Sequence, residues 1–137
     1  RKIYEAETAW LSAYQELEDN KSKISAVYKE MQGVSGGAIV ENLGEEEEND
    51  LQWRAVHSKE GGKYEMILSY LCNQDRNLNI SVNGKTIEQI TLNASGEQKT
   101  KKQSFEIELG KGNNVIRLYS NKGKMPDIDC MELRKIR

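Results

Sequence analysis

Two pairs of acidic residues are each separated by a single residue. Glu5 and Glu7 lie near the amino terminus, and Asp127 and Asp129 lie in the final segment. In an extended strand, residues two apart point to the same face, so each pair would present both carboxylates on one side. Carboxylates that converge in a partly buried place repel one another, and a divalent cation with oxygen ligands relieves that repulsion. The spacing also fits surface acids on edge strands that pair with nearby lysines.

Catalytic chemistry has little support in the residue types. His57 is the only histidine, and no neighbouring cysteine or Gly-x-Ser-x-Gly segment indicates an activated nucleophile. A carboxylate pair for glycoside hydrolysis needs a cleft around a sugar as well as a suitable separation. We therefore predict that the domain is not an enzyme and that His57 is a surface residue.

Length and charge narrow the class of protein further. The 137 residues fit a single domain, 1–137, and the 20 basic and 22 acidic residues leave a net charge of −2. This balance excludes the electrostatic signature of a protein that binds nucleic acid or an anionic membrane. No apolar run approaches the length of a transmembrane helix, and the opening at Arg1 without a signal-type segment predicts a domain excised from a longer protein.

The two cysteines leave the cellular compartment open. Cys72 and Cys130 permit one disulfide, but two cysteines do not make a disulfide scaffold. Free cysteines are often buried in protein cores, so two buried thiols are the expected arrangement.

Short alternating segments separated by turn signals dominate the chain from residue 51 onward. Seven strands are predicted, over 51–57, 63–71, 78–82, 85–92, 104–109, 115–120 and 127–133. Asn83 and Gly84 form a hairpin dipeptide, and Pro126 stands just before the last strand, where it removes no ladder donor. Without a convincing helix in this part, the pattern predicts an all-β protein with a β-sandwich architecture.

The first third of the chain is less regular. Residues 3–7 alternate as a strand would, with Glu5 and Glu7 on one side. Residues 24–31 fit either a helix or a strand, and their β-branched and aromatic content favours a strand.

Glycines and acids mark the segments that follow. Gly36 and Gly37 predict a turn, followed by a strand over 38–43. The acidic run 45–50 is predicted as a solvated loop, because adjacent carboxylates without turn glycines lack the spacing of a calcium loop.

Several segments, taken in order, resemble those of carbohydrate-binding modules of families 6 and 35. They are YEAE, SGGAIVENLG, GGKYEMILSY, LNISVNGK, GNNVIRLYSNKG and the closing PDIDCMEL. The resemblance covers nearly the whole chain and implies a non-catalytic jelly roll of two antiparallel sheets, appended to a secreted bacterial glycoside hydrolase. The closing segment resembles in particular the modules of α-galactosidase-like enzymes of gut bacteria.

The resemblance also implies a structural calcium ion. In such modules the first and last strands lie near each other, and carboxylates from both hold the ion. By match to the family motif, the expected ligands are Glu5, Glu7 and Asp129. At the position of Asp127 the family usually has an asparagine that points towards the sugar.

The family places its sugar site in loops at one end of the sandwich. An aromatic ring stacks on the sugar there, and polar groups hydrogen-bond the hydroxyls. At the two usual ring positions this chain has Ala38 or Ile39 and the segment 93–103, which contains no aromatic residue. Both expected rings are therefore absent.

Five residues are candidates for the carbohydrate site instead. Asp127, Asn121 and Lys122 lie on or beside the loop before the last strand, where the family places its hydroxyl-binding groups; ordinary turn residues are the alternative. Tyr14 and Tyr28 flank a polar stretch predicted to form a loop, so either could supply a ring; core packing is the alternative.

Other aromatic and basic residues are assigned to structure or solubility. Trp10 and Trp53 are predicted to lie in the core. Lys99, Lys101 and Lys102 are predicted at a charged hairpin tip, although they could meet an anionic sugar such as a uronic acid.

Two functional hypotheses follow. The first is a module that keeps an attached glycoside hydrolase near its glycan, a galactoside or a plant polysaccharide fragment, by raising the effective concentration. The alternative, favoured by the missing rings, is a structural sandwich that has lost sugar binding and packs against the catalytic domain or another subunit. The expected location is secreted, periplasmic or at the bacterial cell surface.

Overall fold

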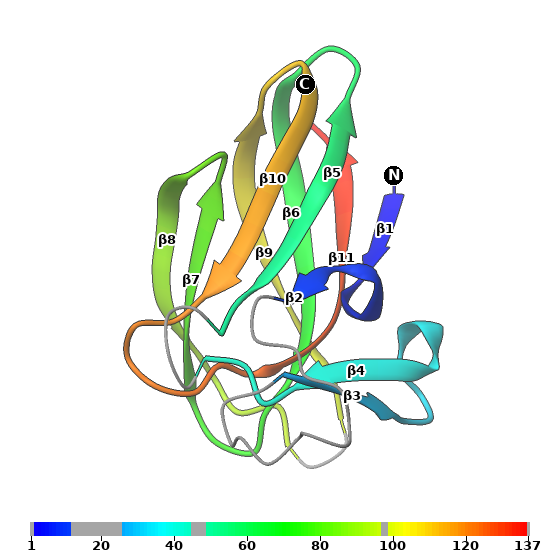
Figure 1. Ribbon diagram of the computed structural model, residues 1–137, viewed down its shortest axis with the longest axis vertical. Coiled ribbons are helices and arrows are strands. Elements are labelled where there is room, and N and C mark those ends of the chain that lie inside the picture. Colours follow the sequence, from blue (N-terminus) through cyan, green and yellow to red (C-terminus); the bar gives the residue numbers. More distant parts are fainter. Residues whose placement is uncertain (1, 12–25, 45–48, 97–98, 137) are drawn as a thin grey trace.

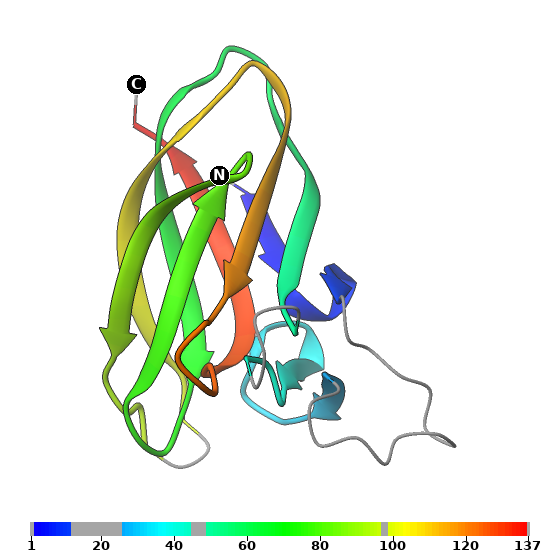
Figure 2. The same ribbon diagram turned by 60° about the vertical axis from the view of Figure 1, so that its left-hand side comes forward.

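The chain is a sandwich of two antiparallel sheets that lie face to face. The computed structural model describes residues 2–11, 26–44, 49–96 and 99–136. Within these ranges the ordered elements are strands and two short 3₁₀ turns, and Figures 1 and 2 show the two layers from two directions. The predicted all-β sandwich is confirmed.

The first sheet is built around its long last strand. Its order is β3-β4-β11-β6-β9, and β1 also pairs with β11. The bounds are β1 (Lys2–Glu5), β3 (Val27–Glu30), β4 (Ala38–Glu41), β6 (Gly62–Leu71), β9 (Lys101–Leu109) and β11 (Asp127–Lys135).

The second sheet has the order β2-β5-β10-β7-β8. The bounds are β2 (Trp10–Leu11), β5 (Leu51–Ser58), β7 (Arg76–Val82), β8 (Lys85–Leu92) and β10 (Gly112–Tyr119). Asn83 and Gly84 both have positive φ, 52° and 85°, as a two-residue hairpin between β7 and β8 requires. All seven strands predicted after residue 50 are thus confirmed.

The strand predicted over residues 3–7 is wrong in its second half. β1 ends at Glu5, and Ala6–Thr8 form a 3₁₀ turn in which the Ala9 amide donates to the Ala6 carbonyl at 3.0 Å. The Thr8 hydroxyl donates to the Glu5 carbonyl at 2.9 Å, which stabilises the turn. Glu7 therefore does not share a strand face with Glu5.

The acidic run 45–50 was predicted as a solvated loop, and this prediction is wrong for its last two residues. Residues 45–48 lie outside the described residues, but Asn49 and Asp50 are only 1% and 2% exposed. The Asn49 side-chain amide donates to the Asn42 carbonyl at 2.7 Å, and Asp50 forms an ion pair with Arg117. Both polar side chains tolerate burial because each has such partners.

Strands predicted in the first third are present with shorter bounds. β3 lies within the predicted 24–31, of which 24–25 are outside the described residues, and β4 covers the first part of 38–43. The predicted turn at Gly36 and Gly37 is the second 3₁₀ turn, Ser35–Gly37.

The core lies between the sheets and is formed mainly by inward-facing residues of β5, β6, β7, β9, β10 and β11. Trp53 is 4% exposed, as predicted, but the core prediction for Trp10 is wrong, because this side chain is 43% exposed. Trp10 lies on the outer face instead, where the Arg54 guanidinium stacks 3.5 Å from its ring centroid. The two cysteines are free and buried, as predicted, and the described residues hold no helix of the length and hydrophobicity that a membrane crossing requires.

Asn114 connects the turn after β9 to the sheet interior. Its Oδ1 accepts hydrogen bonds from the Gly110 amide and the Asn83 side chain, both at 2.8 Å. Its Nδ2 donates to the carbonyls of Val56, Gly110 and Gly112 at 3.0–3.1 Å. The side chain is 1% exposed, so these groups depend on it rather than on water.

We expect Asn114→Ala to lower the free energy of unfolding by about 3 kcal/mol, because buried backbone groups lose their partner. Chemical denaturation measures the change. The neighbouring Asn113 is exposed, so Asn113→Ala should stay within about 0.5 kcal/mol of the wild type. Equal effects of the two variants would contradict this role for Asn114.

Candidate functional site

The acidic residues meet where one edge of β11 changes its partner strand. Ile128 pairs with Val40 of β4, whereas Cys130 pairs with Glu5 of β1. On the other edge, the register with β6 shifts between Ile128 and Cys130, so Asp129 is the extra residue of a β-bulge. Figure 1 shows β1 and β4 along the same side of β11. The bulge therefore places Asp129 between the ends of two strands.

Ser35 holds two of the acids from the turn that precedes β4. Its backbone N–H donates to Asp129 Oδ2 at 3.1 Å, and its hydroxyl donates to Glu5 Oε2 at 2.5 Å. A Cβ added to Gly36 would lie 2.5 Å from Glu7 Oε2 and 3.1 Å from Glu5 Oε1, so this turn also lies against Glu7. The structure thus brings Glu5, Glu7 and Asp129 together, and their role as metal ligands stays a prediction.

The arrangement leaves carboxylate oxygens without hydrogen-bond donors. Among the described residues, Glu5 Oε1, Glu7 Oε1 and Asp129 Oδ1 are buried and have no partner. Burial raises the pKa of Asp129 to about 6; the Ser35 N–H opposes this shift, and Glu5 and Glu7 add to it. Burial also raises the pKa of Glu7. Glu5 and Asp129 place ligand oxygens within 4.8 Å of each other, whereas Glu7 lies nearby but outside that group in the described chain. Unsatisfied carboxylate oxygens of this kind suit a hard divalent cation.

A core tryptophan fixes the end of β1 beside this cluster. Trp53 Nε1 donates to the Glu5 carbonyl at 2.9 Å. Because Trp53 is packed between the sheets, the hydrogen bond ties the Glu5 backbone to the rigid interior. The position of the Glu5 backbone in the cluster is therefore fixed by the core.

A separate pocket of about 380 Å³ is lined by residues of the loops between β6 and β7, β8 and β9, and β10 and β11. Figure 1 shows these loops at one end of the sandwich. Asp127 lies in its wall with three cationic residues, Lys29, Arg76 and Lys124. Burial, followed by the charge of Glu41, raises the pKa of Asp127 to about 6, and the three cations oppose this shift.

Asn121 and Lys122 do not lie in this pocket. They line a smaller hollow of about 150 Å³ against β7 and β8. The Asn77 side chain donates to the Lys122 carbonyl at 2.9 Å, and the Asn79 side chain donates to Asn121 Oδ1 at 3.3 Å. The structure therefore separates Asp127 from two of the residues predicted to act with it.

The tyrosine candidates are not brought to either pocket by the described residues. Tyr28, on β3, is 44% exposed and so does not pack in the core, while its neighbour Lys29 lines the larger pocket. Tyr14 lies outside the described residues. Lys99, Lys101 and Lys102 are exposed.

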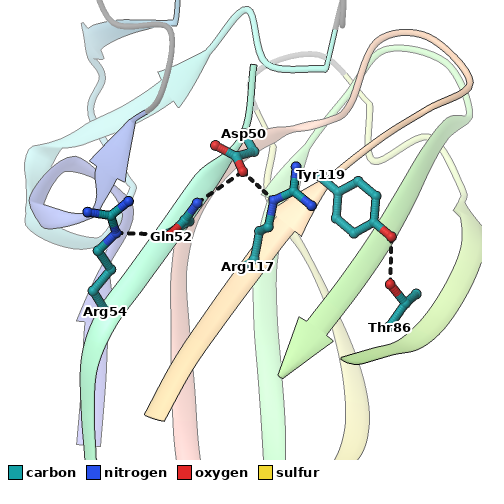
Figure 3. Close-up of polar contacts among 6 residues, drawn as sticks. All are labelled: Asp50, Gln52, Arg54, Thr86, Arg117 and Tyr119. Atoms are coloured by element: carbon teal, nitrogen blue, oxygen red, sulfur yellow. Dashed lines mark hydrogen bonds and ion pairs between the residues drawn. The ribbon is translucent and has the colours of Figure 1, made fainter. Parts of the chain in front are cut away.

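The outer face of the second sheet carries a chain of polar contacts (Figure 3). Asp50 accepts from Gln52 at 3.2 Å and pairs with Arg117, whose guanidinium lies 4.1 Å from the Tyr119 ring centroid. The Tyr119 hydroxyl hydrogen-bonds that of Thr86 at 2.6 Å. These contacts link β5, β10 and β8, and two of their members, Asp50 and Tyr119, are only 2% and 7% exposed.

Sequence reasoning missed Ser35, which contacts Glu5 and Asp129, and the cations around Asp127. Lys29, Arg76 and Lys124 are spread over three segments, so only the folded chain gathers them around Asp127. The SGG turn was the one signal that could have located Ser35.

Comparisons with known proteins agree with this architecture. No protein-family model matches the chain. A mannan endo-1,4-β-mannosidase A from Piromyces sp. is 30% identical over 113 residues, which are 82% of this chain and 18% of that protein. The chain thus spans less than one fifth of the relative's length.

Two solved structures are similar over their whole length. A family 35 carbohydrate-binding module from Clostridium thermocellum is 26% identical, with a TM-score of 0.84 and 98% of each chain covered. A family 35 module from Paenibacillus barcinonensis is 20% identical, with a TM-score of 0.83, and covers 99% of this chain and 100% of its own.

The jelly roll and these matches define the class as that of the non-catalytic sugar-binding domains found attached to glycoside hydrolases. The chain is a carbohydrate-binding module of the family 35 type, which confirms the family 35 part of the resemblance and agrees with the prediction that the domain is not an enzyme. The finer placement beside α-galactosidase-like enzymes stays a prediction.

We expect Gly36→Ala to lower the free energy of unfolding by about 2–3 kcal/mol. The residue has a φ of +68°, and its new methyl group would displace the Glu7 carboxylate. Chemical denaturation measures the change.

Gly37→Ala is the matched control. Its φ is +81°, but nothing lies within 4 Å of the added Cβ, so only the backbone cost of about 1 kcal/mol should appear. Identical losses in the two variants would show that the turn is not packed on the acids.

Proposed function

We propose that this module binds glycan in the loop-end pocket around Asp127 and so holds an attached glycoside hydrolase near its substrate. The observation that carries the proposal is the gathering of Asp127, Lys29, Arg76 and Lys124 around one pocket of about 380 Å³. Similarity to a mannosidase and to family 35 modules supports the role. A weak second site on the same chain raises the local concentration of the catalytic domain near sugar without changing its chemistry.

The charges of the pocket favour an acidic sugar. Three cationic side chains face one carboxylate, and Glu41 offsets only part of this excess through its ion pair with Lys29 at 4.0 Å. A guanidinium such as that of Arg76 forms paired hydrogen bonds to a carboxylate. Asp127 would accept hydrogen bonds from sugar hydroxyls beside it. The ligand class that fits is therefore a uronic-acid-containing plant polysaccharide or its fragments.

The acid cluster is proposed to hold a structural calcium ion. Glu5, Glu7 and Asp129 offer unpaired oxygens, and calcium accepts irregular sets of carboxylate and carbonyl ligands. When bound, the ion supplies positive charge that removes the repulsion among these acids. The protein's own part is positional: the Ser35 turn and the Trp53 hydrogen bond keep the carboxylates in place.

The wider context follows from the proposed role. A module that brings a hydrolase to plant polysaccharide works outside the cytoplasm, so we propose a secreted, periplasmic or cell-surface bacterial enzyme as its carrier.

The alternative is a sandwich that has lost sugar binding and packs against its catalytic domain. The specific observation in its favour is that the described lining of the loop-end pocket contains no aromatic ring. Binding experiments decide between the two roles.

We expect calcium to raise the thermal midpoint of the metal-free protein. At 100-fold excess over the dissociation constant the gain is about 2.7 kcal/mol, roughly 10 °C for a domain of this size. Asp129→Asn should abolish the response while leaving the ion-free protein as stable as the wild type or more stable, because repulsion among the acids falls.

Glu108→Gln, at an exposed acid on β9, serves as the control and should keep the full calcium response. Thermal unfolding with and without calcium, after chelation, provides the measurement. A wild-type midpoint that does not move with calcium would rule out the ion site.

We expect the module to bind polygalacturonate or glucuronoxylan more tightly than neutral mannan or galactan in isothermal titration calorimetry. Arg76→Ala and Lys124→Ala should each weaken binding by about 10-fold or more, because a charge-assisted hydrogen bond is lost. Lys111→Ala, at an exposed turn between β9 and β10, should leave affinity unchanged.

Two other outcomes of the titrations would contradict the acidic-sugar proposal. If the protein bound a neutral polymer tightly, and neither Arg76→Ala nor Lys124→Ala weakened that binding, the proposed carbohydrate-binding role would stand. The proposal that the pocket binds an acidic sugar would be rejected. Flat titrations for every polymer would favour the packing role.

A further inference from the structure

We infer that Cys130 is an additional donor of the acid cluster, which allows this site to bind a thiophilic divalent cation of the zinc and cadmium class. One ligand atom each from Glu5, Asp129 and Cys130 lie within 4.8 Å of one another. The inference rests on the cation site proposed above and assigns to it a donor that an all-oxygen calcium site lacks.

The fold explains how two consecutive residues reach one site. In a regular strand, Asp129 and Cys130 would point to opposite faces of the sheet. In β11 the pairing runs from Ile128 opposite Tyr70 to Cys130 opposite Ser69, which leaves Asp129 as the bulged residue. A bulge sets two residues against one and redirects side chains, so both donors can face the same place.

The opposite edge of β11 brings the third donor. Glu5 is directly paired with Cys130 across β1 and β11, and paired residues present their side chains on the same face. The thiol therefore lies beside a carboxylate from the other end of the chain.

An independent observation marks this place as a ligand site. Asp129 is 4% exposed, and its Oδ1 has no hydrogen-bond partner among the described residues; Glu5 Oε1 is also buried and unpaired. Buried carboxylate oxygens normally have hydrogen-bond partners, so two unpaired oxygens close together indicate a site for a bound ligand. Cys72 offers a contrast, because its sulfur lies 3.7 Å from the Asn93 carbonyl and it belongs to no such group in the described chain.

The donor types determine which ion gains from the thiol. Calcium prefers six to eight oxygen ligands, so a sulfur ligand adds little to its binding affinity. Zinc takes about four ligands, with sulfur at about 2.3 Å and oxygen at about 2.0–2.2 Å, and cadmium shares its affinity for thiolate. On binding, the Cys130 thiol releases its proton to solvent and its sulfur bonds the metal, while Glu5 and Asp129 supply oxygens. Water or Glu7 can complete the shell.

Cadmium is the probe, because a cadmium–thiolate bond absorbs in the ultraviolet and a cadmium–carboxylate bond does not. The full chain, reduced and stripped of metal, is titrated with Cd²⁺. We expect the absorption to saturate at one equivalent in the wild type and in the control Cys72→Ser, and to be absent in Cys130→Ser. Cys130→Ser should also weaken Cd²⁺ affinity roughly 100-fold, whereas Cys72→Ser should leave it unchanged.

The outcomes separate this inference from the cation site itself. A calcium-induced thermal shift without thiolate absorption in the wild type would overturn the role of Cys130 and keep the ion site. Absence of both signals would overturn both proposals. Absorption that survives in Cys130→Ser would assign the bond elsewhere and reject the inference, whereas loss of the wild-type absorption on adding excess calcium would support a shared site.

Discussion

The structure depends on a single strand, β11, which pairs along its whole length on one edge and divides its other edge between β4 and β1. That division brings residues from the two ends of the chain into contact and requires a bulge at Asp129. The acid cluster, the Ser35 turn and the neighbouring thiol all follow from this one change of partner. A regular strand with one neighbour on each side would not gather these groups.

The strands after residue 50 could be predicted because each one buries one face, so alternation of apolar and polar residues is required along its length. The Asn83-Gly84 hairpin was predictable for a similar local reason, since both residues adopt positive φ. The first third lacked such constraints. A turn at Glu7 and an outward Trp10 are set by contacts with Thr8 and Arg54 that no local pattern contains.

The site was predictable only in part, and the reason is geometric. Acids two apart on a strand were expected to share a face, but Asp129 sits in a bulge and Asp127 lines a different pocket. Family resemblance pointed to Glu5, Glu7 and Asp129, which the fold does assemble. The loop-end cations come from β3, β7 and the segment before β11, and only tertiary structure brings them together.

The hydrogen bond from the Trp53 indole to the Glu5 carbonyl joins the apolar interior to the cluster of acidic residues. Any movement of the chain at that cluster changes the polarity felt by a ring that is otherwise shielded from solvent. Trp53 is thus a fluorophore at the boundary between the core and the acidic residues, and it differs from the exposed Trp10 in being shielded from solvent.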